Sequence, residues 1–268
     1  VFENAKSPAT YLNRSSVPTA APPKSADAKA TPVWRRVSDG RVVRWHDHRV
    51  HWMGSEAPPM VQSAPDRRHV IEHWTVPMRD GGRAVTVRGL LTWEPPPSPW
   101  PAVFVAGALA GVVIGLSRTR RWREVLVVAL VALMACATAH TVGNWAASTA
   151  GFGTTLTQSL YGIAGLALGV VALVWAARRG VEAAVPLVLV ASVFLLVATG
   201  LGDIATIGHS QVPSSFPAPV ARFVVTCTIG LGVGLAAAAA LRLRAVTPPG
   251  ARRARHHAST PAAAPVTS

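Results

Sequence analysis

A histidine-rich string lies between Arg44 and Met53, and its residue types are those that bind transition metals. The string reads Arg-Trp-His-Asp-His-Arg-Val-His-Trp-Met. In an extended strand alternate side chains share a face, which places His46 beside His48 and His51 beside Met53. Two imidazoles at positions i and i+2 can share one metal ion, and His51 joins them if the chain bends after His48. The string therefore predicts a metal site built on His46, His48 and His51.

Other side chains of the first hundred residues could complete this site. A third nitrogen could come from His69 or His73 on a neighbouring hairpin. Imidazole suits zinc and copper alike, whereas the thioethers of Met53, Met60 and Met78 favour Cu(I). We therefore expect copper, with zinc as the alternative. The competing interpretation is that these histidines form surface hydrogen bonds and ion pairs, or that Trp and Arg side chains dock a protein partner.

A second group of polar side chains lies within or beside apolar segments of the later chain: Cys136, His140, Asp203, His209, Arg222 and Cys227. Ionisable groups are costly in a bilayer and therefore mark candidate sites. Cys136 precedes His140 by one helical turn, so the two share a helix face. With Asp203 and His209 added, this pair predicts a metal-transfer or substrate site. The alternative is that Asp203 pairs with Arg222, that both histidines lie at the water interface, and that the cysteines only fill space.

The charge distribution divides the chain of 268 residues into a polar first part and an apolar second part. Residues 1–100 hold 14 of the 26 basic and nine of the 12 acidic side chains. The remainder contains apolar segments close to the roughly 20 residues that cross the hydrocarbon core of a bilayer. These segments are 100–117, 125–142, 155–176, 183–201 and 219–241. We therefore expect a membrane α-helical bundle of five transmembrane helices.

Arginines flank these segments at alternate connections: Arg118, Arg120, Arg121, Arg123, Arg178, Arg179, Arg242, Arg244, Arg252, Arg253 and Arg255. The connections 143–154 and 202–218 contain neither Lys nor Arg. The positive-inside rule then places the C-terminus in the cytoplasm and the N-terminal domain outside the plasma membrane. Because the basic residues of the second part lie almost wholly beside these apolar segments, the lipid bilayer, and not nucleic acid, is the expected partner despite the net charge of +14.

Small residues recur at four-residue spacing in three of the segments: Gly107, Gly111 and Gly115, then Gly165 and Gly169, then Gly230 and Gly234. Such faces let helix backbones approach closely. They predict a compact bundle or a homo-oligomer.

The composition also predicts the division of the chain. We expect a flexible N-terminal segment (1–32), an extracytoplasmic β-rich, sandwich-like domain (33–94) and a Pro-rich spacer (95–99). The transmembrane domain (100–241) and a basic cytoplasmic tail (242–268) follow. Within the β-rich domain two alternating stretches flank the turn signal Asp-Gly-Gly at 80–82, which predicts a β-hairpin over 70–76 and 84–93. Five tryptophans are expected to form its core: Trp34, Trp45, Trp52, Trp74 and Trp93.

The stretch Val-Trp-Arg-Arg-Val-Ser-Asp-Gly at 33–40, followed by the histidine-rich string, resembles the small periplasmic β-sandwiches of the bacterial copper-resistance CopC-like family. In some bacteria these are joined to multi-pass CopD-like membrane domains, so the resemblance implies copper handling. Arg41 stands where that family has a His, and no ligand position is carried over. The plan of the whole chain is similar to that of multi-pass membrane proteins of actinobacteria, which implies no activity.

The sequence thus predicts a membrane protein that handles a transition metal, most simply copper, at its extracytoplasmic face. The expected ligands there are His46, His48, His51, His73 and Met53, with transfer toward His140 and His209. The alternative is a non-catalytic accessory or scaffold subunit of a membrane or cell-envelope complex, which docks a partner through its extracytoplasmic domain. The sequence contains no nucleotide-binding loop, metalloprotease or serine-hydrolase motif, and we do not expect an enzyme.

Overall fold

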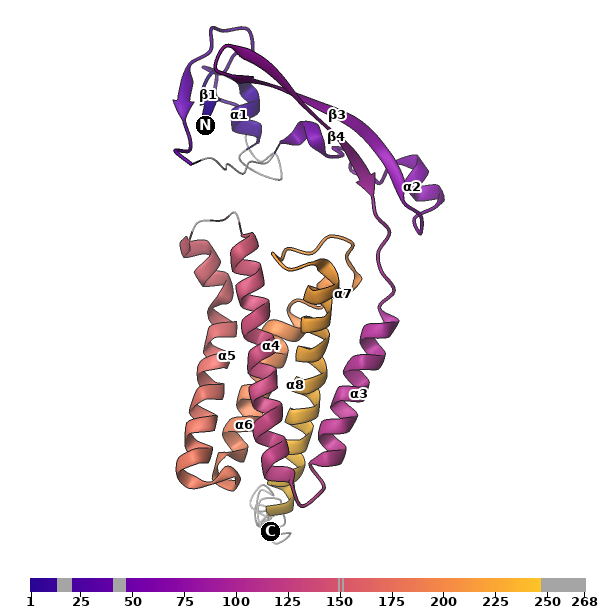
Figure 1. Ribbon diagram of the computed structural model, residues 1–268, viewed down its shortest axis with the longest axis vertical. Coiled ribbons are helices and arrows are strands. Elements are labelled where there is room, and N and C mark those ends of the chain that lie inside the picture. The colour runs from indigo at the N-terminus through magenta and orange to yellow at the C-terminus, as the bar shows by residue number, and fades with distance from the viewer. Residues whose placement is uncertain (14–20, 41–46, 149, 151, 247–268) are drawn as a thin grey trace, which may run out of the picture. The chain divides into compact units, whose positions relative to one another are not determined.

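The computed structural model describes residues 1–13, 21–40, 47–148, 150 and 152–246 (Figure 1). It divides into two compact units, Val1–Pro96 and Pro97–Ser268. The N-terminal unit contains strands and short helices, and the second unit is helical. Trp45, His46 and residues 247–268 of the predicted basic tail lie outside the described residues, whereas the tail's first residues continue helix α8.

A long antiparallel hairpin dominates the N-terminal unit. Its strands are β3 (His69–Asp80) and β4 (Arg83–Trp93), so the predicted hairpin is confirmed. The turn is tight because Asp80 pairs with Arg83, and Gly81 takes the positive φ of 58° that this turn needs. A Cβ at position 89 would lie 2.1 Å from the Trp74 ring, so Trp74 covers the bare backbone of Gly89 on the opposite strand.

A second, smaller sheet pairs β1 (Phe2–Asn4) with β2 (Trp34–Arg36). The α-amino group of Val1 donates a hydrogen bond of 2.6 Å to the Ser38 carbonyl oxygen. With α1 (Pro8–Leu12), the first residues of the chain therefore have defined structure where the sequence predicted a flexible segment.

The two sheets have two strands each and do not share a ladder, so the described N-terminal unit shows no sandwich. Val61 and Val76 are its buried hydrophobic residues among those described. Trp34 is 58% exposed and Trp52 is 45% exposed, which contradicts a common tryptophan core. The physical reason is size, because a two-stranded ribbon offers too little surface to cover several indoles.

Six helices and a π-helical turn form the second unit (Figure 1). They are α3 (Trp100–Leu116), α4 (Trp122–Ala147), α5 (Phe152–Arg179), α6 (Val181–Leu195), the π-helical η2 (Leu196–Leu201), α7 (Ala205–Gly208) and α8 (Ala218–Val246). Among the described residues, four stretches are long and apolar enough to cross a membrane, namely α4, α5, the run Val181–Gly208 and Ala218–Ala245 of α8. The chain is therefore a multi-pass membrane protein. Helix α3 is apolar but has only 17 residues, about 25 Å of helix.

Helix α8 packs against α3, α4 and α6 and is the centre of the bundle. Its core contains large apolar side chains from three helices, including Leu126, Leu130, Leu133, Val188, Leu195 and Leu235. Because these residues recur at three- and four-residue spacing along α4, one stripe of that helix faces inward.

The predicted glycine faces of α3 and α8 differ in whether they contact a neighbouring helix. A Cβ at Gly230 would lie 2.7 Å from the Ala106 oxygen, and one at Gly234 would lie 2.9 Å from the Ala110 Cα. Helices α3 and α8 thus approach through these glycines, as predicted for small residues. A Cβ at Gly107 would meet no described atom within 4 Å, and the same holds for Gly111 and Gly115, so this glycine row of α3 does not make the contact.

Candidate functional sites

Three of the expected ligands come together in the N-terminal unit. His48 begins a 3-10 turn, η1 (His48–Val50), and is not in the extended strand that the sequence predicted. Its Nδ1 lies 3.1 Å from the Sδ of Met53. The rings of His48 and His51 are 5.0 Å apart between centroids and inclined at 48°. The turn therefore brings together side chains that an extended strand would have placed on opposite faces.

The buried carboxylate of Asp47 makes this turn. It is 4% exposed and accepts hydrogen bonds from the Arg49 backbone N–H at 3.0 Å, from Arg49 Nε at 2.8 Å and from Arg49 Nη2 at 2.5 Å. This pairing raises the pKa of the Arg49 guanidinium above its ordinary value. The backbone N–H of His48 also donates to Asn13 Oδ1 at 3.0 Å. The histidine thus projects from a turn whose N-terminal end is fixed by Asp47 and Asn13.

The surroundings of His51 determine which of its nitrogens can bind a metal. Its Nδ1 lies 3.1 Å from the Trp52 carbonyl oxygen, which can only accept a hydrogen bond, so Nδ1 carries the proton. The lone pair of the neutral ring is then on Nε2. Metal-binding histidines have the same arrangement, in which one ring nitrogen donates to a carbonyl and the other binds the ion.

The remaining predicted ligands of this unit do not join the group. His46 lies outside the described residues. His73 is exposed on β3 opposite Leu90, and among the described residues no polar or ring contact joins it to the other histidines. The Nε2 of His69 is 2.7 Å from the Ala64 carbonyl oxygen. Within the described parts of the chain no group of three or more His, Cys, Asp or Glu could hold a metal. The side chains that come together here are therefore two imidazoles and a thioether.

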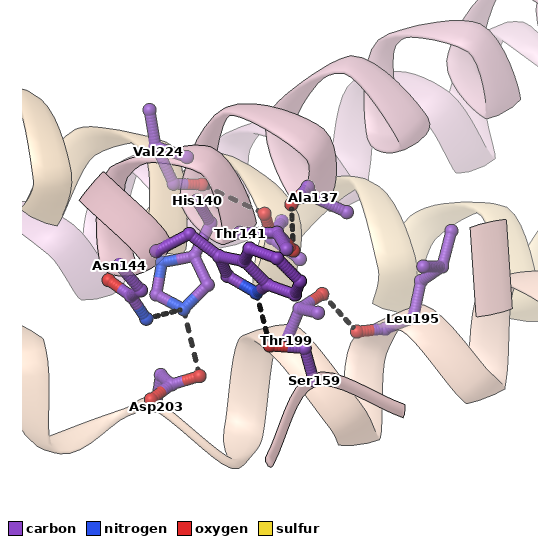
Figure 2. Close-up of polar contacts among 11 residues, drawn as sticks. Ala137, His140, Thr141, Asn144, Ser159, Leu195, Thr199, Asp203 and Val224 are labelled. Atoms are coloured by element: carbon purple, nitrogen blue, oxygen red, sulfur yellow. Dashed lines mark hydrogen bonds and ion pairs between the residues drawn. The ribbon is translucent and has the colours of Figure 1, made fainter. Parts of the chain in front are cut away.

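In the helical unit His140 is buried on α4 and contacts Asp203, which follows η2 (Figure 2). The His140 Nε2 lies 2.8 Å from Asp203 Oδ2 and 3.0 Å from Asn144 Nδ2. Asp203 therefore pairs with this histidine and not with Arg222, contrary to the alternative prediction. The reason is the fold, because η2 ends beside α4 and turns the carboxylate toward it.

One ring nitrogen facing two partners restricts where the proton can be. If Nε2 carries it, Nε2 donates to the carboxylate, and the Asn144 amide must present its oxygen to the ring. If Nε2 lacks it, Nε2 accepts from the amide nitrogen, and Asp203 must be protonated for the contact to be a hydrogen bond. The three side chains therefore form a unit in which one proton fixes the orientation of the others.

A cavity of about 360 Å³ adjoins this network between α4, α5 and the segment after η2. Polar side chains make up much of its wall: Asn144, Ser148, Thr155, Gln158, Ser159 and Asp203. Several of them are bonded to one another, since Trp145 Nε1 donates to Ser159 Oγ at 2.6 Å and Ser148 Oγ lies 3.0 Å from Thr155 Oγ1. The cavity is thus a polar recess at one end of an apolar bundle.

His209 follows α7, and its side chain is exposed. Its backbone carbonyl accepts a hydrogen bond from Arg222. Arg222 Nη2 donates to the His209 oxygen at 2.7 Å and to the Ser210 oxygen at 3.1 Å, which ties this loop to α8. The His209 imidazole makes no polar contact with His140 among the described residues. The predicted grouping of the two histidines is therefore not observed.

Cys136 of α4 and Cys227 of α8 are free thiols on two helices that pack against each other. Within the described residues neither belongs to a group of three or more side chains that could hold a metal, so the predicted grouping of Cys136 with His140, Asp203 and His209 is not observed.

No protein-family model, no curated protein and no solved structure matches this chain. Function is therefore inferred from the geometry of its own residues.

Proposed function

We propose that the protein binds a copper ion through His48, His51 and Met53 of its N-terminal unit. The observation that supports this most directly is the 3.1 Å distance between His48 Nδ1 and Met53 Sδ. Ligand atoms bound to one ion at about 2.0–2.3 Å are roughly 3–4 Å apart, and these two atoms are within that range before any ion is present. His51, which directly follows η1, supplies a second imidazole 5.0 Å from the first between ring centroids.

The ligand types favour copper over zinc. Zinc sites use imidazole, thiolate and carboxylate, whereas a thioether is a soft ligand that selects Cu(I). The carboxylate nearest to the group, Asp47, is already bonded to Arg49 and buried. His46, two residues before His48, is the expected additional ligand.

We further propose that α3 is a fifth transmembrane helix and that the metal site faces the outside of the cell. Arg118, Arg120 and Arg121 follow α3, whereas the chain before it ends in a Pro-rich spacer. With five spans, the positive-inside rule places the N-terminal unit outside the plasma membrane and the C-terminus inside. A 17-residue span is at the lower end of the usual range and fits a thin or locally thinned bilayer.

The decisive experiment is an anaerobic Cu(I) titration of the full-length protein in detergent, in competition with a chelator of known affinity. We expect the double variant His48→Ala/Met53→Leu to lose at least about 100-fold in affinity at this site, since it removes two ligands. His73→Ala is the matched control, because that imidazole is exposed on β3, and it should bind as the wild type does. Wild-type binding no tighter than millimolar, or equal affinity in the double variant, would refute the proposal.

The accessory-subunit alternative is favoured by one observation. The small sheet exposes large apolar side chains on residues that are close in space: Phe2, Val33, Trp34 and Val37. Exposed apolar clusters of this kind often contact other proteins. If this is their role, Trp34→Ser should release a second subunit that copurifies with the wild-type protein from native membranes, and copper binding should be unchanged.

A further inference from the structure

We infer that the polar cavity at one end of the helical bundle binds a small organic cation, a primary ammonium compound that carries hydroxyl groups, with Asp203 as its counter-charge. This site is separate from the proposed copper site and does not depend on it. The cavity of about 360 Å³ is at the small end of the roughly 300–1,000 Å³ range of small-molecule sites. A single metal ion would leave most of this volume empty.

The charges of the bundle are divided between its two ends. Among the described residues of the helical unit, Asp203 is the only acidic side chain at the end that holds the cavity, because Glu124 and Glu182 lie in the first turns of α4 and α6, at the other end. Arg222 is the one arginine near Asp203's end, and its Nη2 donates to two backbone carbonyl oxygens. No described Lys or Arg therefore neutralises Asp203, which favours a cation in the cavity.

The carboxylate of Asp203 is held by one oxygen and open at the other (Figure 2). Its Oδ2 lies 2.8 Å from His140 Nε2, whereas no hydrogen bond from the described residues reaches Oδ1. The side chain is 38% exposed and lines the cavity, so a ligand can reach the second oxygen. An ammonium group paired with it selects the arrangement in which Asp203 is ionised and His140 Nε2 carries the proton.

The hydroxyl groups of the cavity wall use their protons on one another and on the backbone. Ser159 Oγ donates to the Thr155 carbonyl oxygen at 3.0 Å and accepts from Trp145 Nε1 at 2.6 Å. Ser148 Oγ accepts from the Ala150 N–H at 3.2 Å and lies 3.0 Å from Thr155 Oγ1, so one proton of that pair lies between the two oxygens. A wall that keeps lone pairs but few free protons suits a ligand rich in N–H and O–H donors.

The same wall disfavours other classes of ligand. An anion would be repelled by Asp203, and an apolar molecule would leave the polar wall without partners. The described wall contains neither sulfur nor imidazole, so it does not suit Cu(I). Because the cavity lies at the end of a membrane bundle, the ammonium group has two possible sources, a soluble amine and the ethanolamine headgroup of a phospholipid.

The test is equilibrium binding of radiolabelled glucosamine to the full-length protein in detergent, with N-acetylglucosamine as the neutral comparison. Glucosamine carries an ammonium group and hydroxyl groups, and acetylation removes the charge while keeping the hydroxyl groups. We expect N-acetylglucosamine to compete at least about tenfold less well, because a hydrogen bond between two ionised groups is lost. Equal competition, or no saturable glucosamine binding, would overturn the inference without any mutation.

Two variants with matched controls locate the site. Asp203→Asn removes the counter-charge and should weaken glucosamine binding at least about tenfold, whereas Glu124→Gln, at the other end of α4, should bind as the wild type does. Ala147→Phe fills the cavity and leaves the carboxylate in place, so it should also lose binding. Ala146→Phe, at the exposed neighbouring position, should keep it. Wild-type affinity in both Asp203→Asn and Ala147→Phe would contradict the assigned site.

Lipid competition identifies the source of the ammonium group. Phosphatidylethanolamine has a primary ammonium group, whereas the quaternary nitrogen of phosphatidylcholine donates no hydrogen bond. Glucosamine affinity at least about tenfold lower in nanodiscs of phosphatidylethanolamine than of phosphatidylcholine would assign the cavity to a lipid headgroup, and equal affinity would assign it to a soluble amine. His48→Ala/Met53→Leu should bind glucosamine as the wild type does, because the two sites share no residue.

Discussion

The Nε2 of His140 lies 2.8 Å from the Oδ2 of Asp203, 63 positions later in the chain. This contact joins the middle of the bundle to the segment that leaves η2. A π-helical turn holds one residue more than an α-helical turn, so it rotates every following side chain by about 100° around the helix axis. The extra residue of η2 thus determines the direction in which Asp203 points, and functional sites often occur at such turns.

The His140–Asp203 pair should contribute to stability as a unit. His140→Ala leaves the carboxylate without its partner, and Asp203→Asn leaves the imidazole facing two amides. We expect each variant to lower the free energy of unfolding by about 1–3 kcal/mol. The double variant should cost less than the sum of the two, because both changes remove the same contact. Thermal unfolding of the helical signal in detergent measures this.

His209→Ala is the control for that pair, because it removes an exposed imidazole near the same end of the bundle. Its effect should be within about 0.5 kcal/mol of zero. Strict additivity of His140→Ala and Asp203→Asn would show that the contact does not form.

The contact between α3 and α8 predicts opposite effects on stability for two helical glycines, Gly230 of α8 and Gly107 of α3. Gly230→Ala puts a methyl group 2.7 Å from the Ala106 oxygen, a backbone atom that cannot move alone. We expect a loss of about 1–3 kcal/mol from the forced separation of the two helices. Gly107→Ala meets no described atom within 4 Å, so it should gain up to about 1 kcal/mol from better helix propensity.

Unfolding of the two variants under identical detergent conditions tests this difference. Equal stabilities would mean that α3 does not pack against α8 through Gly230. A loss of stability in Gly107→Ala alone would instead place a second copy of the chain on the glycine row of α3.

Local patterns predicted the elements of this protein better than its contacts. The hairpin followed from alternation and a glycine turn, and four membrane helices followed from apolar length, because both signals lie within the element itself. The His140–Asp203 pair did not follow, since it depends on η2, and apolar composition does not distinguish a π-helical turn from an α-helical one.

The turn at His48 was also not predicted from the sequence. Alternation predicted a strand because it considers only which residues are polar. Asp47 was the signal against it, since Asp side chains bond to the backbone two residues ahead and favour a turn over a strand. Here the Arg49 backbone N–H donates a hydrogen bond of 3.0 Å to Asp47 Oδ1.

For the proposed copper site, this role of Asp47 predicts a lower affinity without any change of ligand. Asp47→Ala removes the bonds to Arg49 and frees the turn that orients His48. We expect Cu(I) affinity at this site to fall by about 10- to 100-fold, as for other residues that position metal ligands. The same competition titration in detergent measures it.

Asp39→Asn is the matched control for Asp47, since that carboxylate makes an exposed ion pair with Arg36. Exposed pairs contribute little, so the affinity should stay within about twofold of the wild type. If Asp47→Ala also binds as the wild type does, the turn does not position the ligand.

The number of spans determines on which side of the membrane the proposed copper site lies, and labelling of three single cysteines tests it. In a Cys136→Ser/Cys227→Ser background, Ser55→Cys, Thr119→Cys and Gln211→Cys place a thiol in the N-terminal unit, in the α3–α4 connection and before α8. All three residues are exposed. With five spans, a membrane-impermeant maleimide should label positions 55 and 211 in intact cells, and position 119 only after permeabilisation.

Helix α3 is the element under test, because the other four spans are long enough to cross by themselves. If α3 does not cross, position 55 lies on the same side as position 119, and both should be protected in intact cells while position 211 is labelled. The proposed copper site would then lie on the same side as the arginines that follow α3, which the positive-inside rule places in the cytoplasm. Labelling of position 119 alone would show that the whole topology is reversed, because the arginine-rich connection would then lie outside, against the positive-inside rule.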